Sequence, residues 1–274
     1  MDIIRVFARK TSMTPTDELA FYDGPPLYDV PDLPVYVSVT FTWDIHIGKR
    51  LFALWHNRPR SKPILIGGPA LNDIVPGDFN SGLFLKEGIT ITSRGCPKRC
   101  PWCLVPEREG KLREINIAPG HIVQDNNLLA CSRGHIERVF EMLLQQKKSI
   151  KFLGGLDIDY MKPWHIELFK KIRIGKCGLV VACDRQEDIK RLDKAADLLS
   201  DFDIEKKRCC VLVGYNGETQ EQAQRRCESV LAKGFLPYAQ LYRDTKSKQS
   251  RGEWRKFCYF WCHPNLYRKT IGIK

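Results

Sequence analysis

The sequence has no long apolar run, no internal repeat and no low-complexity tract. No window approaches the roughly 18 consecutive apolar residues that a membrane-spanning helix needs, so no membrane partner is expected. The chain starts MDIIRVFARK, with charged residues where a secretion signal needs an apolar run. Apolar residues make up 43% of the 274 residues and charged residues 28%, which excludes wholesale disorder. We therefore expect a soluble, cytoplasmic protein.

Eleven cysteines is a high number, and an odd one. Disulfide scaffolds are typically short, secreted and loop-rich, whereas this chain is long and has regular apolar runs, so reduced thiols are the better interpretation. Four of the cysteines lie in or beside apolar stretches, namely Cys177, Cys183, Cys209 and Cys210. A cysteine in such a place usually acts as a small apolar residue, and we expect these four to be core residues.

Positive charge is concentrated near the end of the sequence. The net charge is +12, and residues 243–274 carry nine Lys or Arg against two acidic residues. This segment also contains the aromatic run WRKFCYFWCHP, which includes Cys258, Cys262 and His263. Bases could stack on its aromatic rings beside phosphate contacts, or the run could form an amphipathic helix that closes a domain. These three residues could hold a second metal or cluster. Two cysteines and one histidine are too few alone, however, and the spacing of Cys258 and Cys262 fits a packed helix.

Residues 1–87 are predicted to form a small α/β region. Strand-like runs occur at 3–8, 35–41 and 64–66, and residues 44–57 have helical apolar spacing. Strand–helix–strand predicts a Rossmann-like unit, which could cap the rest of the molecule. The segment DIHIG at 44–48 differs from the cobalamin motif D-x-H-x-x-G because its glycine comes one place early. We expect no cobalamin and an ordinary helical role for His46.

From residue 88 to residue 243 strand and helix signals alternate regularly. The β-rich runs are 89–92, 121–127, 150–155, 178–184, 209–215 and 236–243, and the helical segments between them lie near 134–147, 163–173, 186–200 and 218–233. Six such units predict a parallel sheet that is too short to close an eight-stranded barrel. The expected fold class is therefore α/β, with a partial (β/α)6 barrel after the Rossmann-like region and an extension at 244–274. Ligands of such sheets bind at the carboxyl ends of the strands.

Cys96, Cys100 and Cys103 form a C-x3-C-x2-C motif directly after the first strand of this alternation. Pro97 and Pro101 keep the first two cysteines out of helical conformation, so a loop could wrap three thiolates around one centre. Neighbouring basic residues are expected to lower the pKa of the thiols and so favour metal binding. Iron–sulfur clusters usually have four cysteine ligands, so three would leave one iron open to a small chelating ligand.

The motif RGCPKRCPWC in this position resembles the radical SAM superfamily, and its wording is most similar to the cobalamin-binding-type and methylthiotransferase branches. The resemblance covers about residues 88–243. It implies a [4Fe-4S] cluster whose open iron binds S-adenosylmethionine (SAM), and an electron donor such as flavodoxin or ferredoxin. It also implies reductive cleavage of SAM to a 5′-deoxyadenosyl radical that abstracts a substrate hydrogen.

The same resemblance implies residues that contact SAM. Trp102, before the third cysteine, would lie against the adenine. The end of the second strand would hold the methionine amino group, and it reads Asp125-Asn126-Asn127 in place of the common Gly-Gly-Glu. Carboxylate and amide oxygens can still accept hydrogen bonds from an amino group. The alternative is a simple turn at the end of a strand.

Two further strand ends complete the predicted SAM site. Asp184, at the end of the fourth strand, would reach the ribose hydroxyls, or would instead cap the following helix. Val213-Gly214-Tyr215 ends the fifth strand, where the backbone would meet the adenine, and Gly214 would permit a close approach. Gly154-Gly155 ends the third strand and is expected to form a tight turn or to leave room for a ligand.

Zinc is the main alternative for the three cysteines. It would need a fourth ligand such as Cys131 or His121, and a second C-x2-C pair is absent from the sequence. The second functional hypothesis is therefore a zinc-stabilised nucleic-acid-binding protein without catalysis, and a third is a partner-binding protein that has lost turnover. The substrate of the radical chemistry is open, with a preference for a nucleotide or nucleic acid drawn from the basic tail.

Overall fold

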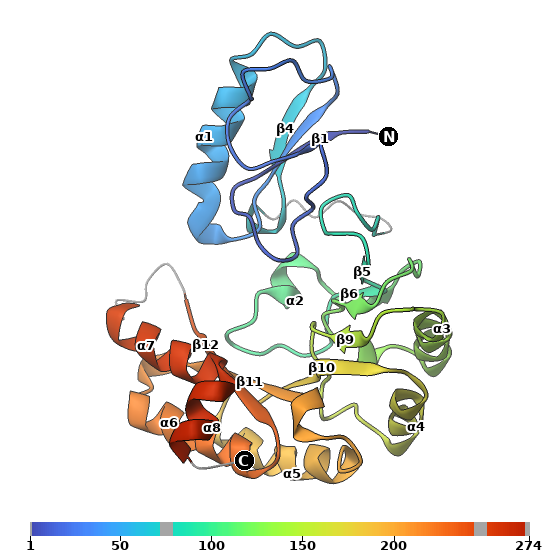
Figure 1. Ribbon diagram of the computed structural model, residues 1–274, viewed down its shortest axis with the longest axis vertical. Helices are drawn as coiled ribbons and strands as arrows, with labels where there is room; N and C mark the ends of the chain where they lie inside the picture. The colour runs from blue at the N-terminus through green and yellow to red at the C-terminus, as the bar shows by residue number, and fades with distance from the viewer. Residues whose placement is uncertain (1, 72–78, 244–250, 272–274) are drawn as a thin grey trace.

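A computed structural model describes residues 2–71, 79–243 and 251–271. It contains two mainly parallel sheets, one of four strands formed by the first 70 residues and one of six strands formed after residue 88 (Figure 1). The α/β class and the parallel six-stranded sheet expected from the sequence are therefore confirmed. In the part of the chain that is described, no helix has the length and apolar character needed to cross a membrane.

The N-terminal sheet has the strand order β2-β1-β3-β4, and every neighbouring pair is parallel. Its strands are β1 (Ile4–Phe7), β2 (Ala20–Phe21), β3 (Val35–Ser38) and β4 (Ile64–Gly67). Helix α1 (Ile45–His56) covers one face because Leu51 and Trp55, four residues apart, both point into the apolar core. Gly48 allows this close packing, since a side chain there would overlap with Val39. His46 is exposed on this helix.

The six-stranded sheet has the order β12-β11-β10-β9-β8-β5, so the strands lie side by side in the order of the sequence. They are β5 (Ile89–Thr90), β8 (Ile122–Val123), β9 (Ile150–Phe152), β10 (Ile174–Ala182), β11 (Lys207–Val213) and β12 (Leu236–Leu241). All neighbouring pairs are parallel. Residues that follow these strands therefore share one edge of the sheet, the carboxyl edge.

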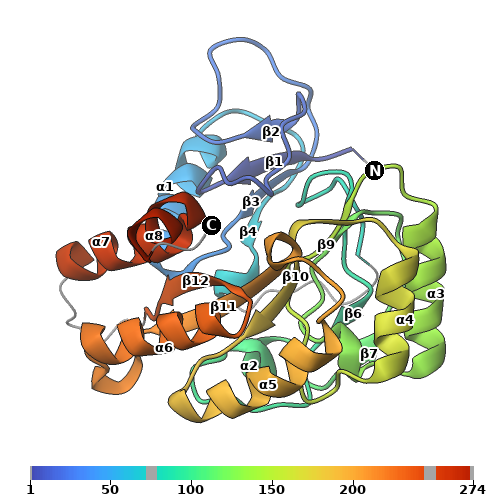
Figure 2. The same cartoon turned by 60° about the horizontal axis from the view of Figure 1, so that its bottom comes forward.

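Four helices alternate with these strands and lie along the outer side of the sheet (Figure 2). They are α3 (Arg133–Leu144), α4 (Pro163–Lys171), α5 (Ile189–Leu198) and α6 (Gln220–Ala232). Strand β10 starts earlier than the sequence predicts, because a bulge at Cys177, whose φ is +52°, joins its two halves. The core between sheet and helices includes Cys177, Cys183 and Cys209, as expected, while Cys210 is half-buried.

The last two helices are α7 (Arg251–Cys262) and α8 (Pro264–Ile271). Helix α7 packs against β12, and Trp254 and Trp261 are buried there. The stacking interpretation of this aromatic run is therefore wrong for both tryptophans, because their ring faces are covered by protein. The packed-helix alternative accounts for them. Lys246 and Lys248 lie outside the described residues.

Candidate metal and cofactor site

The three-cysteine loop lies at the carboxyl edge of the six-stranded sheet, as the sequence predicts. It follows β5 and is enclosed by β6 (Ser93–Arg94), which pairs antiparallel with β7 (Arg113–Glu114). Cys96, Cys100 and Cys103 are half-buried free thiols. The Cys103 N–H donates to the Cys100 carbonyl oxygen at 3.0 Å, which closes a turn. The short helix α2 (Val105–Arg108) then leads the chain away.

Asp125, directly after β8, anchors the start of this loop. Its buried carboxylate accepts the Thr92 N–H at 2.6 Å, the Thr92 hydroxyl at 2.6 Å and the Ser93 hydroxyl at 2.9 Å. Burial raises the pKa of Asp125, while these hydrogen bonds oppose that shift. Both carboxylate oxygens thus hold the backbone that carries the cysteines, a role that the sequence reasoning missed.

Asn126 and Asn127 connect the same strand end to the cysteines themselves. The Asn126 side-chain oxygen accepts the Gly95 N–H at 3.0 Å. The Asn127 amide nitrogen donates to Asp157 at 3.0 Å and lies 3.5 Å from the Cys96 sulfur. The Asn127 side-chain oxygen is buried and has no hydrogen-bond partner. A buried acceptor without a partner costs free energy, and here it lies beside a cysteine where it could accept a hydrogen bond from a ligand.

Asp157 belongs to a group of charged side chains behind the loop. Lys98 lies 2.7 Å from both Asp157 and Asp159, and Arg191 lies 3.3 Å from Asp157. Burial alone would lower the pKa of Lys98, but its hydrogen bonds to the two carboxylates raise it. The lysine is therefore a fixed cation that ties the cysteine loop to the segment after β9. Sequence reasoning missed Asp157, although it follows a strand end closely.

The pKa values of Cys100 and Cys103 move opposite to the prediction. Burial raises the pKa of Cys100 and of Cys103, and the neighbouring thiols and Asp184 add to the shift. Lys98 does lower the pKa of Cys100, but its charge is largely compensated by Asp157 and Asp159. The expectation of activated thiols is wrong for Cys100 and Cys103 because both are partly buried, and because the sequence could not show which acids lie near them. Metal binding at these thiols would release protons.

Gly154 and Gly155, after β9, have different roles. A side chain on Gly154 would overlap with the Asp125 carbonyl oxygen and lie 2.9 Å from the Asp125 nitrogen. Gly155 has φ +100°, and no heavy atom lies within 4 Å of the position that a methyl group would take there, so it forms a turn with open space beside it. The first glycine therefore permits the close approach of the ends of β8 and β9.

Trp102 extends the loop to the ends of β10 and β11. Its indole N–H donates to the Asp184 carboxylate, and its ring contacts that of Tyr215 at 5.4 Å between centroids. Arg185 lies over the Trp102 ring at 5.7 Å. Burial raises the pKa of Asp184, with a contribution from Asp188. The predicted group of Trp102, Asp184 and Tyr215 thus comes together at one place on the carboxyl edge.

The turn after β11 has unusual backbone conformations. Val213 is the last residue of the strand, Gly214 has φ +75°, and Asn216 is left-handed with φ +51°. The Gly214 N–H donates to Glu218 at 2.9 Å. Glu218 in turn pairs with the buried Arg226 at 2.7 Å. The positive φ of Gly214 is one that glycine adopts readily, and its N–H is already bonded within the protein.

Within residues 2–71, 79–243 and 251–271, no group of three or more His, Cys, Asp or Glu is arranged around a single metal ion. A mononuclear zinc site would draw its sulfurs to about 3.8 Å from one another. Of the proposed fourth zinc ligands, Cys131 hydrogen-bonds Ser93, and burial raises its pKa to about 11. His121 lies beside Lys148 and Lys151, which with burial lower its pKa. The loop itself offers three thiols, and thiolates are ligands of both zinc and iron–sulfur clusters.

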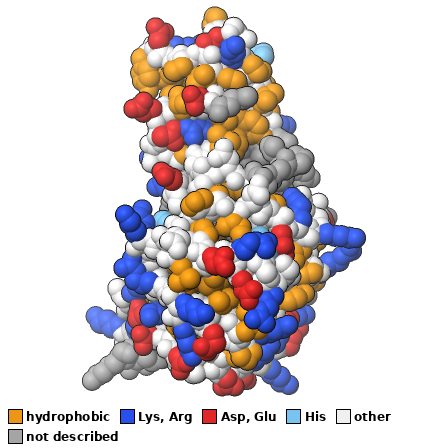
Figure 3. Space-filling view, turned by 90° about the vertical axis from the view of Figure 1, so that its right-hand side faces the viewer, with side chains coloured by type: hydrophobic (Ala, Val, Ile, Leu, Met, Phe, Trp, Pro, Cys, Tyr) orange, Lys and Arg blue, Asp and Glu red, His pale blue; other side chains and the backbone are white. Residues whose placement is uncertain are grey.

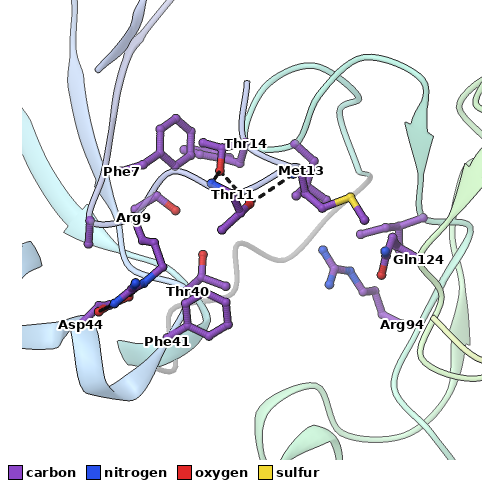
Figure 4. Close-up of a pocket in the computed structure, with 15 residues that line it drawn as sticks. Phe7, Arg9, Thr11, Met13, Thr14, Thr40, Phe41, Asp44, Arg94 and Gln124 are labelled. Carbon is purple, nitrogen blue, oxygen red and sulfur yellow. Dashed lines mark hydrogen bonds and ion pairs between the residues drawn. The ribbon is translucent and has the colours of Figure 1, made fainter. Parts of the chain in front are cut away.

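A separate cavity of about 350 Å³ lies between the carboxyl edges of the two sheets (Figure 4). Arg9, Thr11 and Thr40 come from the N-terminal unit, and Arg94 and Gln124 come from the six-stranded sheet. Arg9 is bound to the buried carboxylate of Asp44 at 2.7 and 2.8 Å. The N-terminal unit therefore adjoins the edge that carries the cysteines, as expected for a cap.

Comparison with known protein families finds no family model that matches this chain. Comparison with curated proteins finds no match either.

Proposed function

We propose that this chain is a radical SAM enzyme. Cys96, Cys100 and Cys103 would hold a [4Fe-4S] cluster with one iron open to SAM. The observation that carries the proposal is the position of the three thiols. Their loop lies at the carboxyl edge of a parallel sheet. It is bonded to residues after three neighbouring strands, Asp125, Asp157 and Asp184, and it contacts the Tyr215 ring after a fourth.

The strand order supports the same proposal. Six parallel strands lie side by side in the order of the sequence, with helices along the outer side of the sheet, and a partial (β/α)6 barrel would have this strand order. In such folds the ligand lies at the carboxyl edge. The N-terminal unit would act as a cap on this edge without binding cobalamin.

When bound, the cluster and SAM would supply a 5′-deoxyadenosyl radical that abstracts hydrogen from a substrate. The chain's own residues would hold and orient these groups. Asn127 would accept a hydrogen bond from the methionine amino group through its unpartnered oxygen, while Asn126 and Asp125 keep the loop in place. Trp102 and Tyr215 would offer ring faces to the adenine, and Asp184 would serve the ribose.

Two properties of the surroundings are also proposals. The eleven free cysteines favour a reducing compartment, so we propose a cytoplasmic location. The reductive step needs one electron, which a flavodoxin or ferredoxin would deliver.

Anaerobic reconstitution tests the proposal. We expect about four irons and four sulfides per wild-type chain, and none in a variant with all three loop cysteines changed to alanine. A matched variant with alanine at Cys258 and Cys262, on α7, should keep its iron. Addition of SAM and dithionite should give 5′-deoxyadenosine with the wild type alone.

The result that would overturn the proposal is a natively purified protein with about one zinc and no iron, which also fails to take up a cluster. That outcome would favour the zinc-stabilised nucleic-acid-binding alternative.

A further inference from the structure

A second hollow, here called the aromatic groove, begins at Trp102 and has a volume of about 920 Å³. It lies between the 3-10 turn η1 (Thr42–Asp44) of the N-terminal unit, the end of β12 and helix α7. Four aromatic side chains line it, namely Trp43, Trp102, Tyr238 and Tyr242, together with the buried Trp254, whose ring faces are covered by protein. Among its described lining residues the charged ones are Arg243 and Arg255, and none is acidic.

One tryptophan ring of the groove lies between a second ring and a cation. Trp43 is 39% exposed, and Phe41 stacks in parallel against one face of its ring, with the two centroids 4.9 Å apart. Arg243, which is exposed, lies over the ring at 5.3 Å, so a base that stacks on Trp43 would take the place of this side chain. A rigid aromatic ring beside an exposed cation is the combination that stacks a base and contacts its phosphate.

A row of rings connects the groove with the cysteine loop. Tyr242 contacts Tyr215 at 4.8 Å, and Tyr215 contacts Trp102 at 5.4 Å. Trp102 is the residue immediately before Cys103. Because Trp43 and Trp102 both line the groove, a ligand lying in it would reach from η1 to the cysteine loop.

The charge of the groove sets it apart from the other hollow. In the cavity between the two sheets, Arg9 is neutralised by Asp44 and Arg94 lies 3.3 Å from Glu109. The face of the molecule shown in Figure 3 carries mixed charge, with acidic side chains scattered among basic ones. Arg243 and Arg255 in the groove have no acidic neighbour among its described lining residues.

We propose that the aromatic groove binds single-stranded nucleic acid and leads one of its bases to the cysteine loop. Duplex does not expose ring faces for stacking, whereas a single strand does, so the groove suits a single strand. Electrostatic attraction from the chain's net charge of +12 adds to this binding. Binding of the strand does not depend on the proposed function. Its role as the substrate does.

The test is fluorescence anisotropy of the full chain, purified anaerobically and without SAM, with labelled oligo(dT) and oligo(rU) of about 12 nucleotides. Trp43→Ala should weaken binding about tenfold through the loss of base stacking, and Trp43→Tyr should restore most of it. Arg255→Ala should reduce the slope of log affinity against log salt by about 0.7. The matched controls, Tyr259→Ala for an exposed aromatic outside the groove and Arg138→Ala on α3, should bind like the wild type.

Three results would overturn the inference. They are no binding of either oligonucleotide at about 50 mM salt, equal weakening by the groove and control variants, or equal affinity for a duplex of the same length. Unchanged melting temperatures of the variants exclude unfolding as the cause of lost binding. Formation of 5′-deoxyadenosine is measured separately. Binding without that product would leave the groove standing and refute the radical chemistry.

Discussion

Replacement of Asp125 by alanine should both release the start of the cysteine loop from its anchor and lower the free energy of unfolding of the protein. The buried carboxylate receives three hydrogen bonds of 2.6, 2.6 and 2.9 Å from Thr92 and Ser93. Without it the Thr92 N–H has no acceptor, and a buried donor left unsatisfied costs about 1–3 kcal/mol. The Thr92 hydroxyl can turn to His135, whose Nε2 lies 3.2 Å away, so its loss is smaller.

The expected total for Asp125→Ala is therefore about 3 kcal/mol. Asp125→Asn keeps one oxygen for the Thr92 N–H and removes a charge that burial penalises, since burial raises the pKa of Asp125. We expect this variant to lose only about 1 kcal/mol.

The assay is urea unfolding of the reduced protein, followed by iron analysis after anaerobic reconstitution. The prediction is that stability and iron content both decrease in the order wild type, Asp125→Asn, Asp125→Ala. An alanine variant that stays within about 0.5 kcal/mol of the wild type and binds full iron would refute the anchoring role.

Two other predictions concern stability, and a third concerns iron binding. Gly154→Ala should lower the free energy of unfolding in urea by about 1–3 kcal/mol, because its methyl group would overlap with the Asp125 backbone. The control Gly134→Ala, on α3 with only Arg138 nearby, should be neutral or stabilise by about 0.5 kcal/mol. Equal effects of the two substitutions would contradict the close approach of β8 and β9. Burial, with a smaller effect of Lys162, lowers the pKa of His165 to about 4. As pH falls from about 6.5 to 4, the imidazole of His165 therefore takes up a proton in the unfolded chain before it does so in the folded protein. The free energy of unfolding should decrease across that window by at most about 3 kcal/mol. A His165→Gln variant whose stability has the same pH profile as the wild type would contradict this. Cys131→Ala should leave iron binding intact, and loss of iron would instead make it a ligand.

Those features of the fold that depend on local sequence patterns could be predicted from the sequence. Apolar periodicity located the alternating strands and helices, and a parallel sheet brings its strand ends to one edge whatever the side chains are. The loop of Cys96 and the turn at Tyr215 could therefore be placed together without knowledge of any contact.

Long-range pairing could not be predicted in the same way. Asp157 and Lys98 are 59 positions apart, and neither has a pattern that points to the other. The direction of the thiol pKa depended on burial and on such acids, so it was missed. Trp43 and Tyr242 come from different sheets, and their shared groove exists only after the N-terminal unit has docked.

The open iron is the centre of this account, and electron paramagnetic resonance tests it most directly. The spectrum of the reconstituted, dithionite-reduced protein should change on addition of SAM, because SAM would bind an iron that no protein side chain occupies. The same spectrum with and without SAM, from a protein that contains a full cluster, would contradict the account.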